Sequence, residues 1–295
     1  MGKFVVSYKK QIIIPNKDLV TLGILPKQVS EYTDEDVGSI ISIPYTDESG
    51  NIEGPIEFEV VGVNHHKDIN DESKPTITLM TKYLIRHAAF DGKEPNNPES
   101  DIAKYGNSRW AVSNIRQWLN SEGKANEWFT PQYEYDTAPD ISTIINADTT
   151  EAGSYADEAG FLAGFSAEIK QHFATVRNTT IRYADFLDST SQYTEETEDK
   201  IFLLSGTEMG LNSNLDKNKL EGNTLSKKFK SATDISSRFK SFKSGEFGHY
   251  WTRSQMILHA SWVYTVFVQS ETSINGSGQH AYTGSCGLAP VIVLC

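Results

Sequence analysis

The 295-residue chain is poor in cysteine, in positive charge and in long apolar runs, and each shortage excludes a class of protein. Its two cysteines, Cys286 and Cys295, are too few for a disulfide scaffold and lack the spacing of a zinc site. Lys and Arg number 27 against 39 Asp and Glu, a formal charge of −12, so we expect no nucleic-acid partner. No apolar stretch reaches the roughly 18 residues of a spanning helix, and the chain start turns polar too soon for a signal peptide.

The last 42 residues are short of charge. From Ser254 to Cys295 the only formally charged residue is Glu271, whereas 22% of the whole chain is charged. Apolar runs at 261–268 and 291–294 predict buried strands. Before and between these runs, Gly, Ser, Asn and aromatic residues predict surface loops.

Loops of this composition are typical of binding surfaces, where aromatic side chains supply contact area and small polar ones supply adaptable hydrogen bonds. The residues expected to bind a ligand are Gln255, Met256, Ile257, Leu258, His259, Trp262, Ser273, Asn275, Gln279, His280 and Tyr282. A neutral β-meander without a partner has the same composition, and strand alternation could instead turn Trp262 into the core. Both alternatives stay open at this point.

Hydrophobic periodicity predicts an α+β protein, because strands come first, helices next and further strands last. Alternation over 56–63 puts Ile56, Phe58 and Val60 on one face of a strand, which a turn-rich stretch joins to the strand before it. Ahead of the C-terminal segment, the expected strands lie at 3–7, 11–14, 37–43, 56–63, 76–80 and 201–204.

Two main helices are expected between these strands, each with a stripe of apolar residues at helical spacing. The stripes consist of Ala111, Ile115, Trp118 and Leu119, and of Phe161, Phe165, Ile169 and Phe173. Ser205 and Glu208 have the spacing of a capping box, so a short helix should begin there and end near Gly210.

Two segments bear on partners. Residues 1–35 are too few for a core of their own and are expected to form an N-terminal arm that packs on the main domain, 36–295, or on a neighbouring subunit. Segment 227–243 mixes Lys and Arg with Phe, a composition found in nucleic-acid sites but more typical of an amphipathic segment with its Phe residues in the core.

No catalytic, metal or cofactor site is predicted. The tripeptide Glu94-Pro95-Asn96 matches the calcium and sugar motif of classical lectins, but it stands in a Pro- and Asn-rich loop where such triplets arise by chance. His65 and His66 could bind a metal only with further ligands, because neighbours on a strand point to opposite faces, and ordinary loop histidines are the favoured interpretation. The best nucleophile is Cys286 with His259 or His280 as base, yet a small buried thiol is the ordinary interpretation of a Cys that begins a β run.

Five motifs stand in a fixed order over most of the chain from Val37 to Leu294. They are Trp110-x-x-Ser113-x-Ile115-Arg116-Gln117-Trp118-Leu119-Asn120; Gly160-Phe161-Leu162; Asp199-Lys200-Ile201-Phe202-Leu203-Leu204-Ser205-x-x-Glu208; Tyr250-Trp251-Thr252-Arg253-Ser254; and Gly287-Leu288-Ala289-Pro290-Val291. The set resembles an uncharacterised domain family of phage tail and prophage proteins from Gram-positive gut bacteria. The family's ending is similar to the variable half of C-type-lectin-like proteins diversified by retroelements. The chain departs from it at Ala289, where Arg is usual, and at Gln255, where Pro-Gly is frequent.

The resemblance implies a C-type-lectin-like domain with a mixed antiparallel sheet, two main helices and a loop-rich C-terminal half. It also implies a non-enzymatic virion protein at the phage tail, present in the bacterial cytoplasm before assembly. Its expected partners are a host-surface protein or glycan, other virion subunits and further copies of itself, with no membrane insertion. The alternatives are a purely structural virion protein and, least favoured, an enzyme similar to formylglycine-generating enzymes, which share the lectin-like fold.

Overall fold

The computed structural model of the protein describes residues 17–145, 153–183, 192–211, 221–230, 236–256, 259–270 and 273–295. Its α-helices there are α1 Ser100–Tyr105, α2 Asn114–Leu119 and α3 Ala167–Lys170, and its 3₁₀ helices are Val29–Glu31, Asp34–Asp36, Trp110–Val112 and Phe161–Gly164. Its strands are β1 Ile40–Ile43, β2 Ile56–Val63, β3 Ile77–Thr81, β4 Val176–Tyr183, β5 Gln192–Asp199, β6 Ile201–Phe202, β7 Tyr250–Gln255, β8 Trp262–Ser270, β9 Ser273–His280 and β10 Val291–Leu294. The expected α+β class is confirmed. No helix of these ranges is long and apolar enough to cross a membrane.

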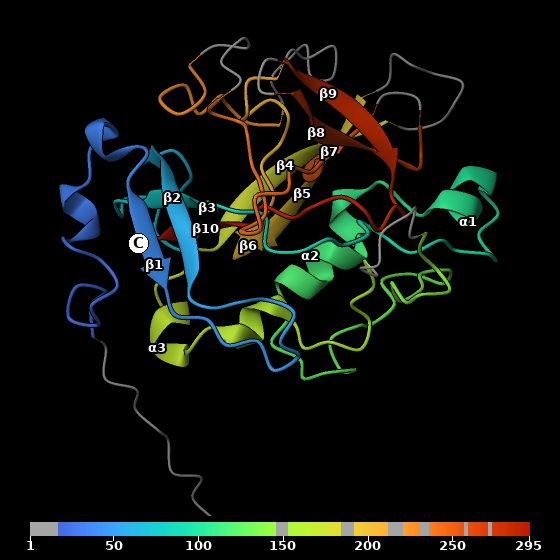
Figure 1. The fold of residues 1–295 in the computed structure, drawn as a ribbon, viewed down its shortest axis with the longest axis horizontal. Coiled ribbons are helices and arrows are strands. Elements are labelled where there is room, and N and C mark those ends of the chain that lie inside the picture. The colour runs from blue at the N-terminus through green and yellow to red at the C-terminus, as the bar shows by residue number, and fades with distance from the viewer. Residues whose placement is uncertain are drawn as a thin grey trace, which may run out of the picture.

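The central sheet has five antiparallel strands in the order β1-β2-β3-β10-β6 (Figure 1). The expected hairpin of β1 and β2 is confirmed, with Ile56, Phe58 and Val60 buried and the glutamates between them half-buried. The last strand of the chain enters the middle of this sheet, where Val291 lies opposite both Met80 of β3 and Phe202 of β6. The C-terminal strand therefore closes the core.

Two smaller antiparallel sheets complete the fold, β4-β5 and β7-β8-β9. In Figure 1 the β7-β8-β9 sheet lies at the top of the molecule, with α1 to its right and with α2 and α3 below. The expectation that much of 270–285 is surface loop is wrong for Ser273–His280, which is a strand that pairs with β8. Its glycines suit this role, since a Cβ on Gly278 would lie 1.8 Å from Met256 Sδ and 2.6 Å from the Trp262 ring.

The two expected helices are shorter than predicted. α2 begins after Ser113, whose hydroxyl accepts a hydrogen bond from the Arg116 N–H, and it buries Ile115, Trp118 and Leu119 as the stripe requires. The second is wrong as one continuous helix. It is a 3₁₀ turn, an extended Phe165 and the single turn of α3.

Tyr45 packs against that break. Its ring centroid lies 5.0 Å from that of Phe161 and 4.9 Å from that of Phe165. A Cβ on Gly164 would stand 2.3 Å from the same tyrosine ring, so only glycine fits where the ring packs against the backbone. The apolar spacing of this segment correctly predicted burial but not the form of the backbone.

The capping-box prediction is half right. Ser205 N–H donates to Glu208 Oε2 over 2.9 Å and Glu208 N–H donates to Ser205 Oγ over 3.0 Å, but the segment is a turn that ends at Gly210 with φ +61°. A helix would need the Glu208 carbonyl for its own next turn. That carbonyl instead accepts from Leu225 N–H at 2.9 Å.

Asp199, the last residue of β5, ties the first of the five motifs to the third. Its carboxylate accepts from Trp110 Nε1 at 3.0 Å and from Arg116 Nε at 2.6 Å. Asn120, at the end of α2, donates to the Ile201 carbonyl at 2.7 Å and accepts from the Ile201 N–H at 3.0 Å. These bonds lock α2 against β6.

Arg253 ties the third motif to the fourth through a buried group that we call the Arg253 network, which comprises Arg253, Glu208, His66, Glu221 and Ser254. Arg253 Nη1 and Nη2 donate to the two Glu208 oxygens at 2.6 and 2.8 Å, and His66 Nε2 lies 3.0 Å from Glu208 Oε1. Burial alone would raise the pKa of Glu208, but the Arg253 guanidinium and the His66 ring outweigh it and hold that pKa well below its usual range. The motifs that carry the resemblance thus form the buried structural frame, by which we mean the contacts of Asp199, Asn120 and the Arg253 network.

The N-terminal and basic segments also meet this frame. From residue 17 the chain packs Leu19, Leu25 and other apolar side chains into the common core, while the strands expected before it lie outside the described residues. In the basic segment 227–243, the expectation of solvent-exposed Lys and Arg residues with buried Phe residues is only partly right. Phe229 is buried, but so are Arg238 and Lys240, whose nitrogens donate to backbone carbonyls of Met209 and Thr81.

Candidate functional site

Five half-buried aromatic rings converge at one edge of the β7-β8-β9 sheet, and we call them the ring cluster. They are Tyr105, His259, Trp262, His280 and Tyr282. Tyr105 stacks on His280 with 4.1 Å between ring centroids and an interplanar angle of 23°. The Trp262 ring is 4.5 Å from that of His280 and 5.4 Å from that of His259, and Tyr282 lies 5.6 Å from Tyr105.

Backbone pairing from three parts of the chain holds these rings together. Trp262 opens β8 and lies directly opposite His280, which ends β9, so both side chains point to one face. A tight turn brings His259 beside Trp262, whose N–H donates to the His259 carbonyl at 3.4 Å. Tyr282 N–H donates to the Tyr105 carbonyl at 2.9 Å, which attaches the end of α1 to the sheet.

The ring cluster carries little charge. Burial lowers the pKa of His280, with the nearby Asp101 only partly offsetting it and His259 adding to it. Its Nδ1 lies 3.3 Å from Ser261 Oγ, a neutral partner. Burial raises the pKa of Tyr282, so this phenol keeps its proton at neutral pH. Flat apolar faces and neutral hydrogen-bonding groups are what this surface offers.

The structure brings together five of the eleven predicted residues. His259, Trp262, His280 and Tyr282 are in the cluster, and Met256 packs beside Trp262, whose carbonyl accepts from Met256 N–H at 2.9 Å. Tyr105 was missed by sequence reasoning. It comes from a helix far earlier in the chain, and no local pattern marks it as a neighbour of β9.

The other predicted residues are not part of the cluster. Gln255 is buried in β7, and its amide donates to Ser108 Oγ at 2.8 Å, which is a structural bond. Gln279 lies opposite Val263 and so faces away from Trp262, because neighbours along a strand alternate. The register pairs Ser273 with Ser270 and Asn275 with Phe267, toward the far end of the hairpin. Ile257 and Leu258 lie outside the described residues.

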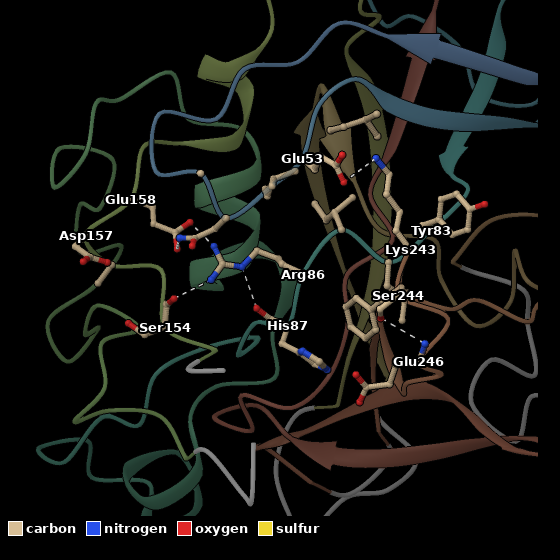
Figure 2. A pocket seen from close by; sticks show the side chains of 18 of the residues that line it. Glu53, Tyr83, Arg86, His87, Ser154, Asp157, Glu158, Lys243, Ser244 and Glu246 are labelled. Atoms are coloured by element: carbon tan, nitrogen blue, oxygen red, sulfur yellow. Dashed lines mark hydrogen bonds and ion pairs between the residues drawn. The ribbon is translucent and has the colours of Figure 1, made fainter. Parts of the chain in front are cut away.

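A cleft of about 1040 Å³ is a second candidate site that the sequence did not indicate, and we call it the Arg86 cleft. Its walls come from stretches of chain around residues 50–57, 83–87, 140–141, 154–158 and 242–246. Figure 2 shows Glu158 and Asp157 on one side, Arg86 and His87 between, and Lys243 and Glu246 on the other side. None of its lining residues belongs to the ring cluster.

Arg86 is fixed in this cleft by partners of the chain itself. Its guanidinium forms an ion pair with Glu158 and donates to the carbonyls of His87 at 2.9 Å and Ser154 at 2.8 Å (Figure 2). Asn51 Nδ2 donates to Glu158 from the opposite side at 2.7 Å. Burial raises the pKa of Glu158, although the Arg86 charge opposes this rise. The pair neutralises the inner end of the cleft.

His65, His66 and Glu208 form the strongest metal candidate among the described residues, with ligand atoms all within 4.8 Å of one another. The favoured expectation of loop histidines is confirmed, since both residues follow β2 in a bend, and their ring centroids lie 4.8 Å apart. Both Glu208 oxygens are bound to Arg253, and His66 is held between Thr78 and Glu208. An ion would have to displace the guanidinium.

The other two candidates of the sequence are inward-facing groups. Glu94 is buried and accepts from Asn97 Nδ2 at 2.5 Å and from the Tyr133 hydroxyl, so its oxygens already have partners. Cys286 is buried, and burial raises the pKa of its thiol far above the usual range. Because the thiolate is the nucleophile, this environment opposes catalysis by Cys286.

Comparison with known proteins gives one family. A model described as a domain of unknown function, DUF6273, matches residues 75–294, a span that includes the central strands from β3 onward and every ring of the cluster. No curated protein matches the chain significantly, and no solved structure does so either.

Proposed function

The chain belongs to the DUF6273 family, a domain of unknown function, and from this premise we propose that it is a non-enzymatic protein whose ring cluster binds an extracellular ligand. The ligand is a host-surface protein or glycan. The observation that carries this proposal is the convergence of five half-buried rings from α1, the turn before β8, the start of β8, the end of β9 and the segment after β9.

A ligand that covers a half-buried aromatic ring removes the rest of its surface from water, which favours binding. Tyr and Trp dominate the energetic centres of binding surfaces, because their rings supply large contact area at low cost in side-chain entropy. Trp262 and His280 are held in place by strand pairing, and Tyr105 by the attachment of α1, so little ordering remains for a ligand to impose. The rings form a preorganised neutral face that suits sugar rings and apolar protein side chains.

We further propose a C-type-lectin-like fold and a place in a phage or prophage tail. The order of elements supports this, since β7 carries the motif Tyr250–Ser254, the hairpin β8-β9 follows, and the motif Gly287–Val291 leads into the closing strand β10. This is the order that the resemblance implies for variable proteins. Retroelement-driven variation, if present, would concentrate on the hairpin and spare the Arg253 network.

The test is a binding screen on a glycan array and on intact Gram-positive bacterial cells. A variant with Tyr105, His259, Trp262, His280 and Tyr282 all changed to alanine should lose every ligand that the native chain captures. Phe247→Ala is the matched control, because this ring is 50% exposed and lies outside the cluster. Binding retained by the fivefold variant would overturn the proposal. A fivefold variant that fails only in virion assembly would favour the structural alternative.

The ligand's chemistry can be tested in the same screen. Neutral stacking and apolar contact are weakly screened by salt and need no ion, so binding should survive EDTA and change little between low and high sodium chloride. Loss in EDTA would instead favour a calcium site at Glu94-Pro95-Asn96. A steep loss in salt would favour charged contacts, with the basic segment 227–243 the first to examine.

A further inference from the structure

The Arg86 cleft has the size of a small-molecule site and a strongly unequal charge. At about 1040 Å³ it lies at the upper end of the volumes that usually hold small ligands. Two permanently cationic residues line it, Arg86 and Lys243, against six acidic ones. The acidic residues are Glu53, Glu57, Asp140, Asp157, Glu158 and Glu246.

Pairing within the chain neutralises only half of these carboxylates. Glu158 pairs with Arg86, Glu53 with Lys243 at 3.5 Å, and Glu57 with Lys82 at 3.0 Å. Asp140, Asp157 and Glu246 have no ion pair within the part of the chain that the structure describes. An occupant of the cleft therefore meets a field that favours positive charge.

Aromatic and apolar side chains lie between the charges. The Phe242 ring is 4.3 Å from that of His87, and Ile85 and Tyr83 line the same cleft. Tyr83 already has a cation over its ring, since Lys82 Nζ lies 4.9 Å from the ring centroid. Aromatic faces attract cations, and the apolar walls suit an aliphatic chain.

We infer that the Arg86 cleft binds an organic cation, an alkylammonium group with an aliphatic chain. Lys243 supports this inference, because its own ammonium pairs with the exposed Glu53 at the edge of the cleft on just such a chain (Figure 2). The ligand takes a similar place, with its head beside the Glu246 carboxylate, which has no ion pair among the described residues, and its chain along Phe242, while Asp157 adds negative charge from the opposite wall. It comes either as a free amine or as a lysine side chain of a peptide, which share this chemistry.

The experiment compares three probes of one chain length by isothermal titration calorimetry: hexylamine, hexanol and hexanoate. Hexylamine should bind saturably and more weakly as salt rises, while the other two should bind far less. A capped Gly-Lys-Gly peptide tests the second source. Tighter binding of the peptide identifies a lysine side chain, and tighter binding of hexylamine identifies a free amine.

Two variants of the cleft are expected to change the affinity for hexylamine in opposite directions. The double variant Asp157→Asn, Glu246→Gln should weaken hexylamine binding, and Lys243→Met should strengthen it by freeing Glu53, each by about two- to fivefold. Glu35→Gln is the matched control, an exposed carboxylate outside the cleft that should change nothing. Thermal melts confirm that each variant folds.

Three outcomes would overturn the inference: equal binding of hexylamine and hexanol, an unchanged affinity in both cleft variants, or an equal loss in Glu35→Gln. The ring-cluster variant of the previous section should bind hexylamine as the native chain does. Failure of one proposal thus leaves the other testable.

Discussion

The Arg253 network and the ring cluster both include residues of the β7-β8-β9 sheet but differ in how their side chains are partnered. In the network a fully buried guanidinium and carboxylate have partners within the chain, and Arg253 and Glu208 are each only 2% exposed. In the cluster the rings touch one another and remain half-exposed. The charged groups of the first region pair with each other on folding, although the buried Arg253 Nε has no hydrogen-bond partner among the described residues. The second region keeps partly exposed ring faces available for a ligand.

This difference predicts that stability resides in the network. Arg253→Met should lower the free energy of unfolding by about 3 to 5 kcal/mol, because it leaves the buried Glu208 carboxylate without its cation. Urea denaturation followed by tryptophan fluorescence measures the loss. The double variant Arg253→Met, Glu208→Met should recover part of it, since it removes both charges of the ion pair. A single variant as stable as the native chain would show that the network is not structural.

A substitution in the core tests whether apolar packing contributes as much to the free energy of unfolding as the Arg253–Glu208 ion pair does. Trp118 is 1% exposed, packs 5.3 Å from the Tyr155 ring and donates to the Ala159 carbonyl at 2.9 Å. Trp118→Ala should also cost about 3 to 5 kcal/mol through the cavity it leaves. Trp118→Phe is the milder control. A melting shift under one degree for the alanine variant would contradict the core position of α2.

Local sequence patterns predicted some elements of the fold and missed those that depend on distant contacts. Period-2 and helical spacing correctly located β1, β2, β3 and α2, because the spacing of apolar residues along a short stretch of sequence determines which face of an element is buried. The break at Phe165 escaped prediction, and the ring that packs against it, Tyr45, lies more than 100 residues earlier in the chain.

The same reasoning applies to the sites. Composition predicted His259, Trp262, His280 and Tyr282 as ligand contacts, and the structure brings their rings together, but only strand register separates them from Gln279. Tyr105 and the Arg86 cleft depend on long-range contacts that no local pattern encodes.

Acidification should separate the charged region from the neutral one. The folded-state pKa of Glu208 is depressed, so its contribution to stability is present above the unfolded value near about 4.3 and is lost as pH falls through and below it. Between pH 5 and 3 the native chain should therefore lose more stability than the double variant Arg253→Met, Glu208→Met. Melting temperatures across this range give the two slopes. The fivefold ring-cluster variant should keep the native slope, and equal slopes for native and double-variant chains would contradict the depressed pKa.

The smallest effect on stability is expected at the ring cluster, and it is paired there with a large effect on binding. His259→Ala or Tyr282→Ala removes a half-exposed ring, so each should change the free energy of unfolding by less than about 1 kcal/mol. Each ring nevertheless belongs to a contiguous surface, and removal of a central aromatic anchor typically weakens binding by about 2 kcal/mol or more, roughly 30-fold in Kd. Chemical denaturation and titration of the same preparations against a ligand found in the screen give both numbers. If the two losses were equal, the rings would be part of the frame after all, because a residue that serves only folding affects binding no more than it affects the folded population.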